Sequence, residues 1–137
     1  MAFPKIRHCL VCEEVREEIN RKRSVLGFYG VTPDVEILLE DFTLPMGHLV
    51  FFLVGGPAEG SFNISFEIFG ESKQVVPRTR DATVVIEGAA KGYNLTVDAG
   101  AVHFPRPGRY TFRLFVDGQP YFEDSFGLLQ AAPGELK

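Results

Sequence analysis

The sequence predicts an all-β domain, an antiparallel β-sandwich of about 8–9 strands with an immunoglobulin-like or C2-like pattern. The chain is rich in aromatic and turn residues, with 13 phenylalanines, 14 glycines and nine prolines. Short runs of alternating apolar and polar residues recur at intervals of roughly ten residues, which is typical of sandwiches. A length of 137 residues fits one domain. We therefore expect residues 1–137 to form a single sandwich, with 131–137 as a frayed tail.

The first third of the chain leaves two interpretations open. Residues 5–12 alternate as a strand does. Residues 10–22 could form a helix, because Val11, Val15 and Ile19 lie four apart. They could instead continue the strand, turn at Asn20-Arg21 and return as a hairpin. No N-capping residue precedes the segment, which favours the hairpin. A further strand is expected at 34–40.

The middle of the chain predicts four strands. Residues 47–56 form a continuous apolar run, which indicates a buried strand. Residues 61–70 alternate strictly, which indicates a half-buried strand, and we expect these two strands to pair as a hairpin across the turn sequence GGPAEG. Two more strands are expected at 81–88 and 93–104.

The last unit is the clearest hairpin. Residues 107–129 begin with Pro-Gly, alternate through a strand and reach Asp117-Gly118, a pair typical of type I′ turns. Tyr110 stands near the start of this strand. Its position is typical of the tyrosine corner of immunoglobulin-like sandwiches, in which the hydroxyl bonds to upstream backbone.

Charge and hydropathy exclude several classes of partner. The formal net charge of −4 argues against nucleic acid, whose binding depends on clustered Lys and Arg. No apolar run approaches the length of about 18 residues that a membrane span needs. The N-terminus lacks the apolar core of a signal peptide, so we expect a cytoplasmic protein with no membrane partner.

The sequence motifs do not indicate an enzyme. Cys9-x-x-Cys12 is one ligand pair without a second, and residues three apart on a strand point to opposite faces. Metal or redox chemistry at Cys9 and Cys12 is therefore the least favoured interpretation. No nucleophile elbow or P-loop is present. We expect no catalytic residues, no bound metal and no cofactor.

A protein partner is the favoured expectation. Arginines and an aromatic residue next to prolines in loops are plausible contacts. The candidate partner-contact residues are Arg16, Arg78, Arg80, His103, Phe104 and Arg106. A homodimer is the commonest outcome of such surfaces. The alternative function is a small-ligand or carbohydrate-binding module that uses Tyr29, Tyr93 or Tyr121.

Motifs spread along the chain resemble a family of small bacterial proteins classed as a domain of unknown function. The matching residues are Cys12, Glu13, Glu14, Val15, Arg16, Leu26, Gly27, Tyr29, Pro107, Gly108, Tyr110, Phe112, Asp117 and Gly118. The chain departs from the pattern at 20–22, where glycine often precedes the lysine. The resemblance implies a compact β-sandwich in a bacterial or phage-associated cytoplasmic setting, with no assigned activity. It also supports the N-terminal hairpin over the helix. The favoured function is thus a non-catalytic interaction, accessory or assembly module.

Overall fold

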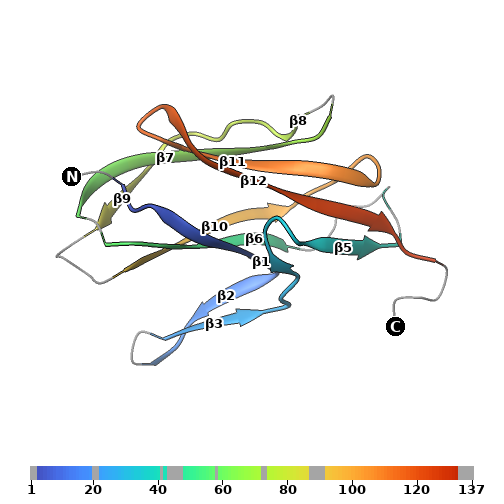
Figure 1. The fold of residues 1–137 in the computed structure, drawn as a ribbon, viewed down its shortest axis with the longest axis horizontal. Helices are drawn as coiled ribbons and strands as arrows, with labels where there is room; N and C mark the ends of the chain where they lie inside the picture. The colour runs from blue at the N-terminus through green and yellow to red at the C-terminus, as the bar shows by residue number, and fades with distance from the viewer. Residues whose placement is uncertain are drawn as a thin grey trace.

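A computed structural model describes residues 3–19, 22–40, 42, 48–57, 59–71, 74–86 and 92–132. These residues form twelve strands and no α-helix, so the expectation of an all-β fold is confirmed. Within them, no helix has the length and hydropathy to cross a membrane. Figure 1 shows two sheets lying one over the other, with a separate hairpin beyond one of them.

The strands fall into three sheets. The four-stranded sheet has the order β10 (Tyr93–Ala101), β6 (His48–Gly55), β1 (Ile6–Cys12) and β4 (Gly30–Val31). The six-stranded sheet has the order β5 (Glu36–Leu39), β12 (Gln119–Gln130), β11 (Gly108–Val116), β7 (Gly60–Phe69) and β8 (Gln74–Val76). Its sixth strand, β9 (Ala82–Ile86), pairs with β7 along the same edge as β8, farther toward the start of β7. A small hairpin joins β2 (Glu14–Glu17) to β3 (Arg23–Leu26).

The hydrophobic core lies between the two larger sheets. Phe51 of β6 stacks on Phe112 of β11 with ring centroids 4.1 Å apart, and both rings are fully buried. Phe126 of β12 packs beside Phe51 at 5.7 Å. Aromatic pairs of this kind add about 0.5–1.5 kcal/mol to the free energy gained by burying their area. The sheets are therefore held together by ring contacts between residues far apart in sequence.

The C-terminal hairpin is confirmed in detail. β11 pairs with β12, and Asp117 and Gly118 take φ values of 49° and 84°, the positive pair that a type I′ turn requires. Tyr110 is 5% exposed, and its hydroxyl donates a 2.7 Å hydrogen bond to the Arg106 carbonyl. The upstream backbone bond expected of a tyrosine corner is thus present.

The N-terminal hairpin is also confirmed, but the long strand expected before it is broken. Residues 14–17 are strand and pair with 23–26, while the turn at Asn20-Arg21 lies outside the described residues. The backbone N–H of Glu13 donates to the carbonyls of both Leu26 and Gly27, which ends β1 and begins β2. This break, together with the short strands β4 and β8, explains why the strands number twelve rather than 8–9.

Two expectations about strand pairing differ from the structure. β6 pairs with β1 and β10, whereas β7 pairs with β8, β9 and β11, so the turn sequence GGPAEG crosses between sheets and does not close a hairpin. The fold is also not purely antiparallel, because β5 runs parallel to β12. Alternation of apolar residues shows which face of a strand is buried, but it does not reveal the neighbouring strand.

Candidate functional site

Strand β10 forms an open edge of the four-stranded sheet. Its neighbour is β6, with pairing from Tyr93↔Gly55 to Ala101↔His48. No described strand pairs with its other side. The register shifts between Asp98 and Gly100, where the Gly100 N–H donates to the Asp98 carboxylate at 2.7 Å. The regular part of the open edge is therefore the segment from Tyr93 to Asp98.

A cleft lies on the outer side of β10. The β2–β3 hairpin lies beyond the outer face of the four-stranded sheet (Figure 1), and β2 contacts β6. Between hairpin and sheet is a cleft of about 460 Å³, which we call the acidic cleft. Its lining residues are Glu13, Glu14, Val15, His48, Val50, Thr96 and Asp98.

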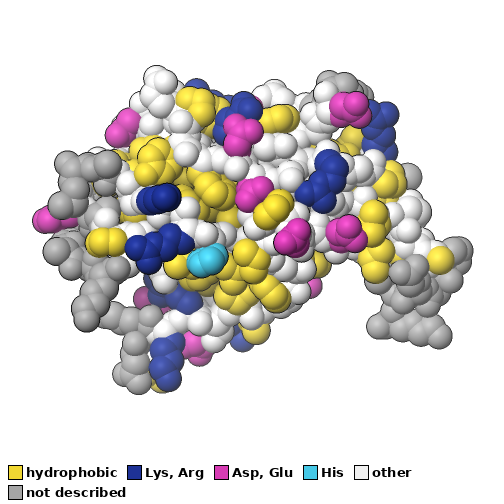
Figure 2. Space-filling model, viewed as in Figure 1, with side chains coloured by type: hydrophobic (Ala, Val, Ile, Leu, Met, Phe, Trp, Pro, Cys, Tyr) yellow, Lys and Arg dark blue, Asp and Glu magenta, His cyan; other side chains and the backbone are white. Residues whose placement is uncertain are grey.

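Negative charge predominates in the acidic cleft. Three acidic residues line it, and one of them, Glu14, accepts a 2.7 Å hydrogen bond from Arg16 Nε. His48 Nδ1 lies 3.3 Å from the Asp98 carboxylate. Figure 2 shows charges of both signs interspersed with apolar side chains on the face seen in Figure 1. Local excess charge in the cleft is thus a property of this site and not of that whole face.

A second pocket lies on the inner side of β10. It has a volume of about 280 Å³ and opens between β10 and the segment after β8; we call it the side pocket. Its lining residues are Ile64, Ser65, Phe66, Thr79, Arg80, Ala82, Thr96, Val97 and Asp98. Thr79 fixes its wall, since its N–H donates to the Phe66 carbonyl at 2.9 Å and its hydroxyl accepts from the Phe66 N–H at 3.1 Å.

The two cysteines are poorly placed for chemistry. Cys9 belongs to the core between the sheets, and Cys12 is buried on the opposite face of β1 with its thiol 3.8 Å from the Val50 carbonyl. The expectation of opposite faces is confirmed, and both faces are buried at these positions. Burial raises the pKa of Cys9 to about 12 and raises that of Cys12 as well, so both stay thiols near neutral pH. Within the described residues, no cluster of three His, Cys, Asp or Glu side chains could hold a metal ion.

The six predicted contact residues do not gather at one site. Arg80 lines the side pocket, and Arg16 lies beside the acidic cleft through Glu14. His103 Nε2 lies 2.6 Å from the Phe42 carbonyl, and the Arg106 backbone carbonyl accepts a hydrogen bond from the Tyr110 hydroxyl. The prediction that Phe104 contacts a partner is wrong. Phe104 is 1% exposed and packs edge-on against Tyr110 at 4.8 Å, so it belongs to the core and cannot contact a partner.

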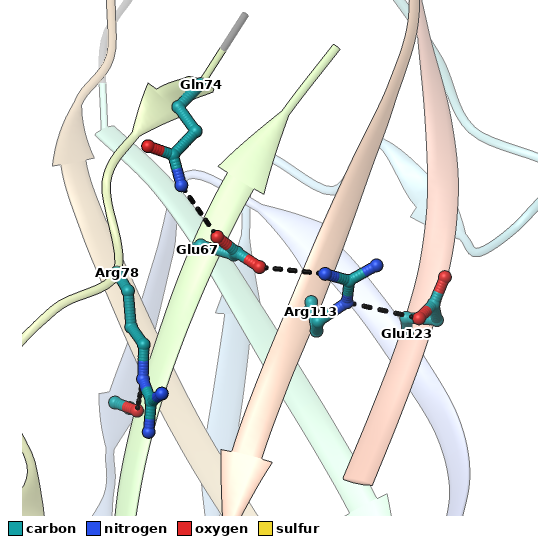
Figure 3. A network of polar contacts seen from close by, with 6 residues as sticks. Glu67, Gln74, Arg78, Arg113 and Glu123 are labelled. Atoms are coloured by element: carbon teal, nitrogen blue, oxygen red, sulfur yellow. Dashed lines mark hydrogen bonds and ion pairs between the residues drawn. The ribbon is translucent and has the colours of Figure 1, made fainter. Parts of the chain in front are cut away.

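Arg78 belongs to a separate polar surface on the six-stranded sheet (Figure 3). Its guanidinium lies 4.0 Å from the centre of the Phe115 ring and its Nε donates to Ser65 at 3.1 Å. Beside it, Glu67 accepts hydrogen bonds from Gln74 at 2.8 Å and from Arg113 at 3.0 Å. These groups satisfy one another, which indicates a structural role.

Sequence reasoning missed the open edge of β10. Its alternation predicts a strand, but alternation does not indicate that one side of the strand is unpaired. The lack of proline and lysine from Tyr93 to Asp98 is the one available signal, because edges closed to partners often carry these residues.

Residues 7–125 match the Family of unknown function (DUF6941). The chain belongs to this family. The DUF6941 match confirms the resemblance stated from the N-terminal and C-terminal motifs, and it includes every residue that lines the acidic cleft and the side pocket. No curated protein matches the chain.

The likeness to one solved structure is weak. The alkylpurine DNA glycosylase AlkC of Pseudomonas fluorescens, bound to DNA containing an abasic site analog, is similar at 19% identity and a TM-score of 0.43. The match covers 73% of this chain and 28% of the glycosylase chain, so this DUF6941 protein spans little more than a quarter of that structure's length.

Proposed function

We propose that this protein is a non-catalytic interaction module, an accessory or assembly component of a bacterial or phage cytoplasm, that holds an extended segment of a partner protein as an added strand on β10. The observation that carries the proposal is the open edge of β10 with a cleft on each side. In recognition by strand addition, main-chain hydrogen bonds supply affinity, and pockets for alternate side chains supply specificity. β10 offers both.

We further assign the sandwich to the immunoglobulin-like class. The order β1-β6-β10 corresponds to strands A, B and E, and the order β7-β11-β12 corresponds to C, F and G. The Tyr110 bond to the Arg106 carbonyl, at the connection from β10 to β11, supports this assignment. In this arrangement β10 takes the place of strand E, and no described strand occupies the place of strand D beside it.

A sugar-binding or small-ligand function has less support. Such a site needs flat aromatic faces turned toward solvent. Tyr29 and Tyr93 are partly buried and pack against the core. The Tyr121 ring packs edge-on against Phe3, with ring centroids 5.3 Å apart, and its hydroxyl donates a hydrogen bond to the Phe3 carbonyl. Two of the three candidate rings are therefore turned inward, and the third is held by its own contacts.

The test uses linear peptides selected from a random library against the purified protein. Each selected peptide is synthesised in two forms, with N-methyl groups on one or the other set of alternate amides. An added strand presents one set to β10 and the other to solvent. We expect one methylated form to lose binding and the other to keep it. Equal binding of both forms, or failure to select any peptide, would refute strand addition.

A further inference from the structure

We infer that the partner segment alternates basic and apolar side chains, with basic residues over the acidic cleft and an apolar residue in the side pocket. The inference rests on the proposed function and names the chemistry of its partner. It combines three observations: the length of the open edge, the direction of the side chains of β10, and the different lining of the two clefts.

The length of the site is set by the backbone of β10. Pairing from Tyr93 to Asp98 is regular, and beyond it Gly100 has φ of 72° and its N–H is already bonded to Asp98. At about 3.3 Å per residue, this segment accommodates a partner strand of about six residues, roughly 20 Å long.

The direction of side chains follows from the pleat. Leu95 and Val97 belong to the core between the sheets, whereas Asn94, Thr96 and Asp98 alternate with them and face outward. Residues directly opposite each other on paired strands share a face. A partner residue opposite Val97 would thus point toward the side pocket. Its two neighbours would point outward, toward the acidic cleft.

The two clefts favour different side chains. Glu13, Glu14 and Asp98 line the acidic cleft. Glu14 pairs with Arg16 and Asp98 lies 3.3 Å from His48 Nδ1, but the Glu13 carboxylate has no ion pair or hydrogen bond with any described residue. A Lys or Arg side chain would compensate this charge. The exposed surface of the side pocket is mainly apolar and includes Ile64, Phe66, Ala82 and Val97, with Arg80 and Asp98 among the polar residues that also line it. An aliphatic or aromatic side chain would fill it.

The same charges argue against a second copy of the chain as the occupant. Pairing of β10 with β10 would bring two acidic clefts together at one junction, and like charges across an interface oppose association. A net charge of −4 on each copy adds to this repulsion. A basic segment from another protein would be repelled neither by the cleft nor by the net charge.

The test compares three fluorescein-labelled octapeptides by anisotropy. The first alternates lysine and valine, the second has four lysines followed by four valines, and the third alternates glutamate and valine. N-methylation of the solvent-side amides prevents self-association. We expect the first to bind, the second to bind roughly tenfold more weakly because its alternation is lost, and the third not to bind.

Variants of the protein locate the effect. We expect Glu13→Gln and Asp98→Asn each to weaken binding of the lysine–valine peptide by roughly two- to fivefold, the range for exposed ion pairs. The asparagine oxygen keeps the bond to the Gly100 N–H, so the fold is retained. Glu36→Gln removes an exposed carboxylate from β5, a strand of the other sheet that does not line the cleft, and should change nothing.

The outcomes separate the two proposals. If binding depends on which amides are methylated but the glutamate peptide binds as well as the lysine peptide, the charge inference is refuted and strand addition stands. If binding of neither peptide depends on which amides are methylated, strand addition is refuted, and the inference about its partner is refuted as well.

Discussion

Removal of the Arg113 guanidinium should destabilise the protein by leaving the Glu67 carboxylate without its main partner. The Glu67 side chain is 10% exposed and the Arg113 side chain 29% exposed, with 3.0 Å between Arg113 Nη1 and Glu67 Oε2. Loss of one partner of a fully buried pair costs about 3–5 kcal/mol. Partial exposure of Arg113 allows water to screen the charge, so we take a smaller cost, about 2–3 kcal/mol, for Glu67 alone.

Arg113 makes two other contacts, which contribute less. Its Nε donates to Glu123 at 3.1 Å, but the Glu123 side chain is 54% exposed, and such pairs contribute at most about 1 kcal/mol. Its guanidinium lies 4.6 Å from the centre of the Phe69 ring, a cation–π contact of about 0.5–1 kcal/mol. We therefore expect Arg113→Met to lower the free energy of unfolding by about 3 kcal/mol.

The decisive comparison is the double variant Glu67→Gln, Arg113→Met. Without the Glu67 charge, no uncompensated carboxylate remains, and Gln74 can still bond to the amide at position 67. We expect the double variant to be more stable than Arg113→Met alone, as measured by urea unfolding at pH 7. A double variant less stable than the single one would refute the reasoning, because the loss would then come from packing and not from the stranded charge.

Three other changes test the fold. Tyr110→Phe should lower the free energy of unfolding by about 1 kcal/mol and the melting temperature by about 3 °C, because the hydrogen bond from the Tyr110 hydroxyl to the Arg106 carbonyl is lost; an unchanged melting temperature contradicts this. Phe51→Ala should cost about 4 kcal/mol in urea unfolding, because it opens a cavity beside Phe112. Burial raises the pKa of Cys9 from 9.0 to about 12, so the unfolded thiol ionises first and stability should fall as pH rises from 9 to 12. Cys9→Ala should show a shallower fall over that range, and an equal slope in both proteins would count against a buried thiol.

The strands could be predicted from the sequence because alternation records which face of each strand is buried. Their partners could not. The apolar run forms β6, whose middle is buried on both sides, since Phe51 enters the core while Val50 and Phe52 are also buried on the outer face. Such a run suits a central strand, and β6 is one, but the sequence does not say that β1 and β10 flank it.

Two polar residues and one aromatic show why the site was harder to predict than the fold. Ser65 and Glu67 occupy the polar side of an alternating strand, yet both are buried because Arg78, Gln74 and Arg113 bond to them. Phe104 stands in a proline-rich loop, yet its ring fills the core. The local sequence pattern carries no information about these long-range contacts. An open strand edge likewise depends on which strands the rest of the chain provides.

Amide hydrogen exchange, resolved residue by residue with and without the lysine–valine peptide, tests the docking claim most directly. Exchange reports whether each N–H is bonded or open to water. We predict that the peptide slows exchange at alternate amides between Tyr93 and Asp98, those that face the open edge of β10. Slowed exchange confined to β5 or β9, or no change in β10 at a peptide concentration that saturates the protein, would contradict the account.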